Sequence, residues 1–453
     1  MEQPRRSSGN AIADFFRFAE RGTDLGTEIK AGVTTFMVMS YIIAVNPAIL
    51  SAAGVPVPAA AAGTALIAGI LSIAMGVYAN YPIALAAGLG LNGVVAFQLA
   101  GAGNGPLTWQ GAMGVIVLEG LVITVLVLVG LREAVMDAVP LALKKAIGIG
   151  IGLFILFIGC VDGGIIVQNP GGPVPPVAFV FPAEPGVAVT LLGLLITIVL
   201  VARRVPAALL LSIVINTIIA IVVGVKALPS SFSVAPDFGT IGQFDLGQVF
   251  SVLGPLTALL TIFSIMLSDF FDTMGTATAI TDQAGLTDKD GRVPGIGRLL
   301  LVDSIGALAG GAAGVSSNTS YIESAAGVAE GGRTGFTSVV VGVLFLVAVL
   351  LSPLATLVPF QATAPVLIVV GFLMVAHLSD INFSDIEEGF PALLALILMP
   401  LTFSITNGIG AGFVAYVLIK TVRGKVGEVH PLMWVVAIGF LIYFAQAWLN
   451  TVI

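Results

Sequence analysis

Long apolar runs separated by short polar segments make up most of this 453-residue chain. A helix needs about 20 mostly apolar residues to cross a bilayer, and the pattern predicts fourteen such spans, seven on either side of a polar stretch at 226–251. The spans are 30–50, 59–79, 82–100, 107–130, 141–163, 187–202 and 205–225, then 252–278, 296–314, 317–330, 335–358, 361–379, 391–405 and 407–421. A final apolar segment, 432–449, is either a fifteenth span or a helix in the membrane interface. We therefore expect an all-α polytopic membrane protein.

The spans also predict an internal repeat. An odd number of spans per half turns the second half upside down, and inverted repeats place a binding site at the bilayer midplane between interrupted helices. Span 3 contains the glycine-rich run 86–93, and span 10 begins with the polar run 314–320. Each is the third element of its half. The sequence thus predicts a 7+7 inverted repeat in which spans 3 and 10 are each a short strand plus a half-helix. The alternative is that the glycines only permit close helix packing.

Composition supports this class and excludes others. Hydrophobic residues make up 57% of the chain and charged residues 9%, with a mean hydropathy of +1.08, whereas a soluble domain carries about 25% charged residues. Cys160 is the single cysteine, so no disulfide framework or cysteine metal site exists. The net charge is −7 without a basic stripe. We expect no cofactor and no nucleic-acid partner.

Lys and Arg predict the orientation, because they are enriched in cytoplasmic loops. The loop between spans 5 and 6 has none, and the loop between spans 7 and 8 has only Lys226. The opposite side holds Arg5, Arg6, Arg17, Arg21, Arg132, Lys144, Lys145, Arg203, Arg204, Lys289, Arg292, Arg298 and Arg333. This distribution predicts a cytoplasmic N-terminus in the cell (inner) membrane. Loop 379–389 departs from it, since it should be internal yet is acidic.

Two carboxylates in span 8 are the first candidates for chemistry. Asp269 and Asp272 are three residues apart, so they share one helix face, and Thr273 lies on that face too. A charged side chain at membrane depth is costly and marks ion or solute pathways. Two carboxylates in a low-dielectric site repel, which makes one of them a plausible proton carrier. The alternative is a capping cluster at a helix end.

Other polar residues fall at the expected breaks. Glu323 follows the break in span 10, where a carboxylate and free backbone N–H groups converge if a half-helix starts there. Asn92 occupies the matching place in span 3 and offers both a donor and an acceptor. Asp303, inside span 9, either positions the surrounding helices or relays protons. Glu119, in span 4, has no evident role.

At these residues the chain resembles the nucleobase–cation symporter 2 family of the nucleobase:ascorbate transporter superfamily, specifically its AzgA-type purine permeases. The resemblance covers almost the whole chain. It includes the segments 27–36, 41–47, 88–92, 268–276, 319–328 and 331–335 in the same order. The chain departs from the usual pattern at Ala87, where members commonly have Pro, and at Gly93, where they commonly have Ala.

The resemblance implies a core of spans 1–4 and 8–11 that moves against a gate of spans 5–7 and 12–14. It implies these divisions: a cytoplasmic N-terminal segment 1–29, core 30–130, gate 131–225, an extracellular loop 226–251, core 252–358, gate 359–421, and a C-terminal segment 422–453 with an extra hydrophobic helix. A homodimer is implied in the same way.

The resemblance also implies the activity. Asp269 and Glu323 would bind the purine, with Asn92 contributing from span 3, and Asp272 would take part in proton coupling. Thr273 is the further candidate for substrate binding and Asp303 for coupling. We expect import of adenine, guanine or hypoxanthine by proton symport with elevator-like alternating access, with sodium as the alternative coupling ion.

Two other activities fit less well. An anion transporter of the same fold, for sulfate or bicarbonate, would place a basic residue at the span 3 or span 10 break, whereas these breaks are neutral or acidic. A membrane prenyltransferase with a magnesium–diphosphate site at Asp269 and Asp272 would need a second aspartate-rich motif, which is absent. We therefore expect a transporter and not an enzyme.

Overall fold

The computed structural model describes residues 11–100, 105–130, 138–169, 176–180, 184–228, 235–287 and 293–452. Five cations used above to orient the chain lie outside the described residues: Arg5, Arg6, Arg132, Lys289 and Arg292.

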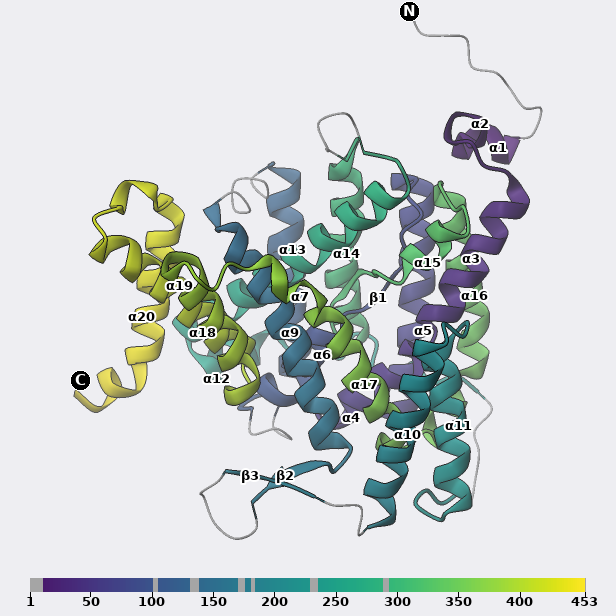
Figure 1. The fold of residues 1–453 in the computed structure, drawn as a ribbon, viewed down its shortest axis with the longest axis horizontal. Helices are drawn as coiled ribbons and strands as arrows, with labels where there is room; N and C mark the ends of the chain where they lie inside the picture. Colours follow the sequence, from purple (N-terminus) through teal and green to yellow (C-terminus); the bar gives the residue numbers. More distant parts are fainter. Residues whose placement is uncertain are drawn as a thin grey trace, which may run out of the picture.

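The first half contains seven membrane segments in the predicted order. After the short helices α1 (Ala11–Phe16) and α2 (Phe18–Arg21) come α3 (Leu25–Met39) with α4 (Ile42–Ser51), α5 (Val57–Ala74) with the π-helix η1 (Met75–Ala79), β1 (Leu85–Ala87) with α6 (Leu89–Gly93) and the π-helix η2 (Val94–Leu99), α7 (Trp109–Leu128), α9 (Leu141–Asp162), α10 (Pro185–Ala202) and α11 (Ala208–Val222). The hairpin β2 (Ile166–Gln168) and β3 (Val177–Phe179), which the hydrophobic pattern does not predict, lies between α9 and α10. It is at the end of the molecule opposite α1 and α2 (Figure 1).

The second half repeats this order. It comprises α12 (Leu246–Leu253), α13 (Pro255–Gln283), α14 (Ile296–Ala313), β4 (Asn318–Ser320) with α15 (Ser324–Ala329), α16 (Gly335–Ala348) with η4 (Val349–Leu357), α17 (Phe360–Met374) with η5 (Val375–Asp380), α18 (Ile386–Thr402), α19 (Ile405–Val422), η6 (Val426–Glu428) and α20 (Pro431–Val452). Ten segments in the described part of the chain are long and apolar enough to cross a membrane. The two broken spans and the shorter helices α11 and α18 complete the predicted set.

The predicted corner between spans 13 and 14 is present, with shifted bounds. Helix α18 begins at Ile386 rather than at 391 and ends at Thr402. Phe403 takes a left-handed φ of 49°, and the hydroxyl of Ser404 accepts a hydrogen bond from the Asn407 N–H at 3.2 Å. This side-chain cap starts α19, so the chain reverses here. The segment 432–449 is part of α20, a continuous helix that packs against α13 and α19.

The helices pack in two groups. Helices α9, α10, α11, α17, α18 and α19 pack mainly on one another, and α3, α4, α5, α7, α14 and α16 do the same. Helix α13 contacts both groups, through α7 on one side and α9 and α19 on the other. In Figure 1 the second group surrounds β1, while α18, α19 and α20 lie at the opposite edge.

The segments 27–36 and 331–335 meet because Glu28 caps α16. The buried Glu28 carboxylate accepts hydrogen bonds from the backbone N–H groups of Arg333 at 2.9 Å, Thr334 at 3.2 Å and Thr337 at 3.1 Å, and from the Thr337 hydroxyl at 2.6 Å. The first N–H groups of a helix have no partner inside the helix. A carboxylate on α3 therefore satisfies the beginning of a helix some 300 residues later.

Replacing Glu28 with alanine is expected to lower the free energy of unfolding by about 2–4 kcal/mol, because several buried donors lose their acceptor at once. The unfolding temperature in detergent measures the change. Glu330→Ala is the matched control, since Glu330 pairs with Lys30 on the surface and such pairs contribute about 0–1 kcal/mol. Equal shifts in the two variants would contradict the capping role.

Two of the four carboxylates in the acidic loop that departs from the charge pattern, Asp380 and Glu387, are paired with cations in the structure. Glu387 forms ion pairs with the cations at the end of α19: Lys420 at 2.6 Å, Arg423 at 3.0 Å and Lys425 at 2.7 Å. Asp380 pairs with Lys145 at 3.6 Å. The loop therefore lies on the same side of the molecule as the cations that set the orientation.

Candidate functional site

The site is built around a two-stranded sheet made by the two broken spans. Strands β1 and β4 pair antiparallel, with Ala86 opposite Thr319, and all six residues are buried. The half-helices start at opposite ends of this sheet. Gly88, just before α6, donates its N–H to the Ser317 carbonyl at 2.9 Å, and Ala84 donates its N–H to the Ser324 hydroxyl at the start of α15 at 3.0 Å.

The approach to β4 is strained and depends on a glycine. Ser316 is buried with a left-handed φ of 70°, a conformation that costs a non-glycine residue energy and is typical of functional sites. A Cβ at Gly310 would lie 2.1 Å from the Ser316 carbonyl oxygen. Only glycine at position 310 lets α14 pass so close to the strand.

Asp303 holds three elements together below the sheet. Its carboxylate accepts hydrogen bonds from the Thr273 hydroxyl on α13 at 2.6 Å, and from the Ser320 N–H and hydroxyl on β4, both at 2.9 Å. The hydroxyls of Thr273 and Thr319 are 2.9 Å apart. The contacts of Asp303 are those of a positioning residue, which is the first of its two predicted roles. Thr273 donates its hydroxyl hydrogen to Asp303, so a direct contact with substrate stays a prediction.

Glu323 and Asp272 are two further carboxylates near this network. Glu323, just before α15, accepts a hydrogen bond from the Tyr41 hydroxyl at 2.6 Å and remains partly exposed. Asp272 on α13 is half-buried and close enough to Glu323 and Asp303 for their charges to interact. The Tyr321 hydroxyl donates to the Ala87 carbonyl, so Tyr321 fixes the end of β1 against the start of α15.

Asp269 lies one helical turn before Asp272 and is 1% exposed. The resemblance implies base binding by Asp269 and proton coupling by Asp272. Asp272 is the more exposed of the two, and it lies within electrostatic range of Asp303 and Glu323. The base-binding role of Asp269 stays a prediction.

Asn92 on α6 is fully buried, and neither its side-chain oxygen nor its nitrogen has a hydrogen-bond partner among the described residues. Buried polar groups without partners are rare and costly, and this one lies on the half-helix that leaves the sheet. The amide therefore has its full hydrogen-bonding capacity available for a ligand. Gly93 stands where members of the resembled family commonly have Ala. The structure explains the glycine, because a Cβ at this position would lie 2.8 Å from Ile158 and 3.0 Å from Phe154 on α9.

Tyr41 and Tyr321 are candidate site residues that the sequence analysis did not single out, and each donates a hydrogen bond at the site. Both stand inside segments singled out above, 41–47 and 319–328. The signal available was an aromatic hydroxyl in an apolar segment. Such a group needs a hydrogen-bond partner when buried.

Comparison with known proteins places the chain among transporters. Residues 26–411 match the model described as the Permease family. The chain is 41% identical over 434 residues to the adenine permease AdeQ of Escherichia coli (strain K12), covering 95% of each chain. It is 39% identical over 444 residues to the guanine/hypoxanthine permease PbuG of Bacillus subtilis (strain 168), covering 95% of this chain and 98% of that one.

Among solved structures, the transmembrane domain of the cyanobacterial bicarbonate transporter BicA superposes with a TM-score of 0.62 at 17% identity. The match covers 86% of this chain and 97% of that one. At this identity the similarity concerns the fold. It is the 7+7 inverted repeat predicted from the span count.

Proposed function

We propose, from the premise that this chain belongs to the permease family of nucleobase:ascorbate transporters, that it imports purine nucleobases together with protons. The protein is a multi-pass membrane protein and not an enzyme. AdeQ is an adenine permease and PbuG a guanine/hypoxanthine permease, and both align over nearly their full length. These relatives support a purine as the substrate.

The observation that carries the proposal is that Asp272 on α13 and Glu323, just before α15, lie within electrostatic range of each other, and that α13 packs against the sheet made by the two broken spans. A neutral purine presents N–H donors and ring-nitrogen acceptors along its edge. The two carboxylates can accept from the donors, and the Asn92 amide, which has no partner among the described residues, can serve either kind of group. We therefore give the base-binding role to Asp272 with Glu323, ahead of Asp269.

Proton coupling follows from the same pair. Two nearby carboxylates repel when both are ionised, and such groups titrate as a set rather than singly. A base that accepts hydrogen bonds from one protonated member and donates to its ionised partner binds best when one proton is present. Proton entry then favours the loaded transporter. Sodium is the alternative coupling ion.

The packing supports movement of two bodies. We assign the group containing α3, α5 and α16 to the core spans 1–4 and 8–11, and the group containing α9, α17 and α18 to the gate spans 5–7 and 12–14. Helix α13, which contacts both groups, and the sheet are assigned to the core. An elevator-like motion would carry the whole site past the gate. We propose this motion, a homodimer, and a cytoplasmic N-terminus in the cell (inner) membrane. The orientation is supported by the loop 163–184, which contains the β2–β3 hairpin and no Lys or Arg, since the hairpin lies at the end opposite α1 and α2 (Figure 1).

An anion such as sulfate or bicarbonate is not favoured by the site. BicA shares the fold, but residues 85–99 and 316–329 here contain no Lys or Arg. The charges at the sheet are carboxylates, which repel an anionic substrate.

Purified protein in lipid vesicles is expected to accumulate labelled hypoxanthine, guanine or adenine when an inward proton gradient is imposed. One proton per base supports accumulation up to about tenfold for a pH difference of about one unit. A protonophore should reduce accumulation to equilibration without abolishing exchange. Purine uptake that is unaffected by the proton gradient would contradict proton coupling. Saturable uptake of sulfate or bicarbonate without purine uptake would contradict the proposed substrate and favour an anion transporter.

A further inference from the structure

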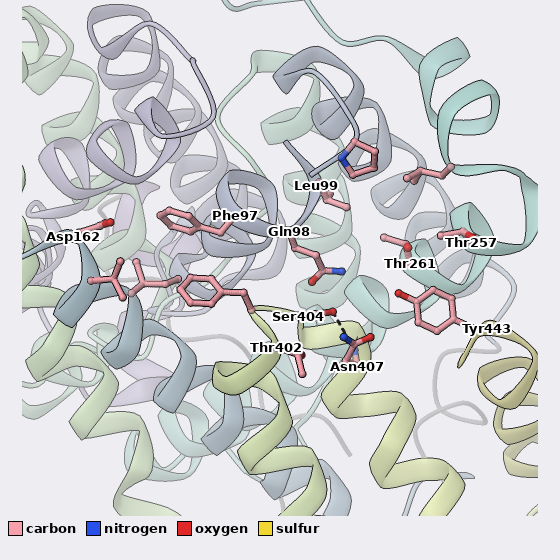
Figure 2. A pocket seen from close by; sticks show the side chains of 15 residues that line it. Phe97, Gln98, Leu99, Asp162, Thr257, Thr261, Thr402, Ser404, Asn407 and Tyr443 are labelled. Carbon is pink, nitrogen blue, oxygen red and sulfur yellow. Dashed lines mark hydrogen bonds between the residues drawn. The ribbon is translucent and has the colours of Figure 1, made fainter. Parts of the chain in front are cut away.

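A cavity of about 640 Å³ lies beyond the far end of the broken span 3. Its walls come from η2, the end of α9, the start of α13, the corner between α18 and α19, and α20. Figure 2 shows Asp162 at one end and Tyr443 at the other, with Gln98 between them. Asp272, Glu323 and Asn92 are not among its described lining residues. The cavity is therefore distinct from the site on the sheet.

The cavity has the properties of a small-molecule site. Pockets that bind such ligands are clefts of about 300–1,000 Å³ with mostly apolar walls and a few polar groups. Here Phe97, Phe403 and Tyr443 supply flat aromatic surface. Asp162 adds a carboxylate to the wall, and its buried Oδ2 atom has no hydrogen-bond partner in the described part of the chain. A flat neutral base with N–H donors matches this combination.

Gln98 forms a hydrogen-bonded contact between the two groups of helices at this cavity. Its side-chain nitrogen donates to the Thr406 hydroxyl at 2.8 Å, and its side-chain oxygen accepts the Ile405 N–H at 3.1 Å. Gln98 belongs to span 3, whereas Ile405 and Thr406 begin α19. The Gln98 side chain therefore connects span 3, which we assign to the core, with the corner between spans 13 and 14, which we assign to the gate. Figure 2 shows Gln98 pointing toward that corner.

Four phenylalanines fill the space behind this contact. Phe403 lies at the centre, with ring centroids 6.0 Å from Phe97, 5.8 Å from Phe154 and 5.3 Å from Phe157. Phe97 and Phe403 line the cavity, while Phe154 is fully buried against Gly93, the neighbour of Asn92. The cluster therefore extends from the cavity wall to Gly93, beside Asn92.

We propose that the cavity is a vestibule that binds a purine base before it reaches the sheet, and that Gln98 with the four phenylalanines is the gate between the two. The proposal rests on the proposed function. It adds a second binding position and the residues that separate it from the first. In the present structure the gate is closed, so the Gln98 contacts must break each time the route opens.

The gate is tested by cross-linking Gln98→Cys with Thr406→Cys in a protein whose single native cysteine is changed to serine (Cys160→Ser). A short, reducible thiol–thiol cross-linker is expected to stop purine uptake by at least tenfold, and reduction should restore it. The control is Thr108→Cys with Gln248→Cys. It replaces another Gln–Thr pair, with the side-chain oxygens 2.9 Å apart, between α7 and α12, which pack on each other. Its cross-link should leave uptake unchanged.

The outcomes separate the two proposals. If the Cys160→Ser parent, which carries no cross-link, takes up no purine, the proposed function fails. If it takes up purine and the cross-linked Gln98→Cys, Thr406→Cys protein does so at the uncross-linked rate, the gate is refuted. An equal loss of uptake on cross-linking the control pair would also refute the gate, because the loss would then not depend on the contact between Gln98 and Thr406.

The vestibule is tested by protection of a cysteine in its wall. Thr257 lines the cavity and is half-buried, so Thr257→Cys in the Cys160→Ser protein should react with a maleimide. Adenine or hypoxanthine is expected to slow the reaction at least threefold, and to do so still when Glu323→Gln has disabled the site on the sheet. Adding Asp162→Asn should remove the protection. Protection that disappears with Glu323→Gln alone, or that survives Asp162→Asn, would overturn the vestibule site.

Discussion

Replacing Glu323 with glutamine is expected to reduce purine uptake by about 100-fold or more. Glutamine keeps the size of the side chain and can still accept the Tyr41 hydroxyl, which lies 2.6 Å from the carboxylate. It loses the charge that accepts from the N–H donors of the base. Hydrogen bonds to charged groups contribute about 1.5–3 kcal/mol, and sites built on such pairs discriminate by several orders of magnitude when one partner is missing. Uptake by vesicles at matched protein density is the measurement.

Asp272→Asn should resemble Glu323→Gln in equilibrium purine binding, because these two side chains form the proposed pair. Asp269→Asn is the matched comparison one helical turn away. If Asp272 holds the base, Asp269→Asn retains more binding than Asp272→Asn. If Asp269 holds it, as the resemblance implies, the order reverses. If the Glu323→Gln variant takes up purine at the wild-type rate, the binding site is not beside the sheet.

Replacing Asp303 with alanine is expected to lower the free energy of unfolding by about 3–5 kcal/mol and to abolish uptake. Three buried donors, on Thr273 and on the backbone and hydroxyl of Ser320, lose their acceptor together. Each buried donor left without a partner costs about 1–3 kcal/mol, and neighbouring contributions are not additive. The unfolding temperature in detergent and the yield of folded protein both report the loss.

Asp303→Asn tests whether the charge or the geometry matters. Asparagine keeps one acceptor oxygen, so part of the stability should return while uptake stays low if Asp303 also relays protons. Full recovery of uptake with partial recovery of stability would leave Asp303 as a positioning residue. An Asp303→Ala protein that unfolds at the wild-type temperature would contradict the network itself.

The span count, the inverted repeat and the two breaks could be predicted because they depend on local composition. Apolar length sets the spans, and the glycine-rich run 86–93 and the polar run 314–320 cannot continue an apolar helix. The corner after Thr402 could also be predicted from the sequence, although the helix bounds on either side of it differ by a few residues in the structure. The fold therefore followed from signals within each segment.

The partners of individual side chains could not be predicted, because they lie far away in the sequence. Gln98 reads as an ordinary polar residue until it meets Thr406, 308 positions later. Glu28 reads as a charge near a helix start, although the helix that it caps begins at Gly335. Strands of three residues carry no alternation from which the pairing of β1 with β4 could be predicted.

The acidic loop 379–389 illustrates why charge counts alone mislead. The positive-inside pattern counts Lys and Arg and gives little weight to Asp and Glu. Here the Glu387 carboxylate forms ion pairs with Lys420, Arg423 and Lys425. The loop and the end of α19 form a nearly neutral cluster that only the three-dimensional contacts reveal.

The pairing of β1 with β4 has a consequence for the origin of this protein. Each half of the chain contributes one strand, so neither half can complete the sheet by itself. A half-length ancestor could have made it only by associating with a second copy inserted in the opposite direction. Gene duplication and fusion would then have made permanent a partnership between two antiparallel subunits. Each broken span would since have been free to specialise, one with the glycine-rich run 86–93 and Asn92, the other with the polar run 314–320 and Glu323.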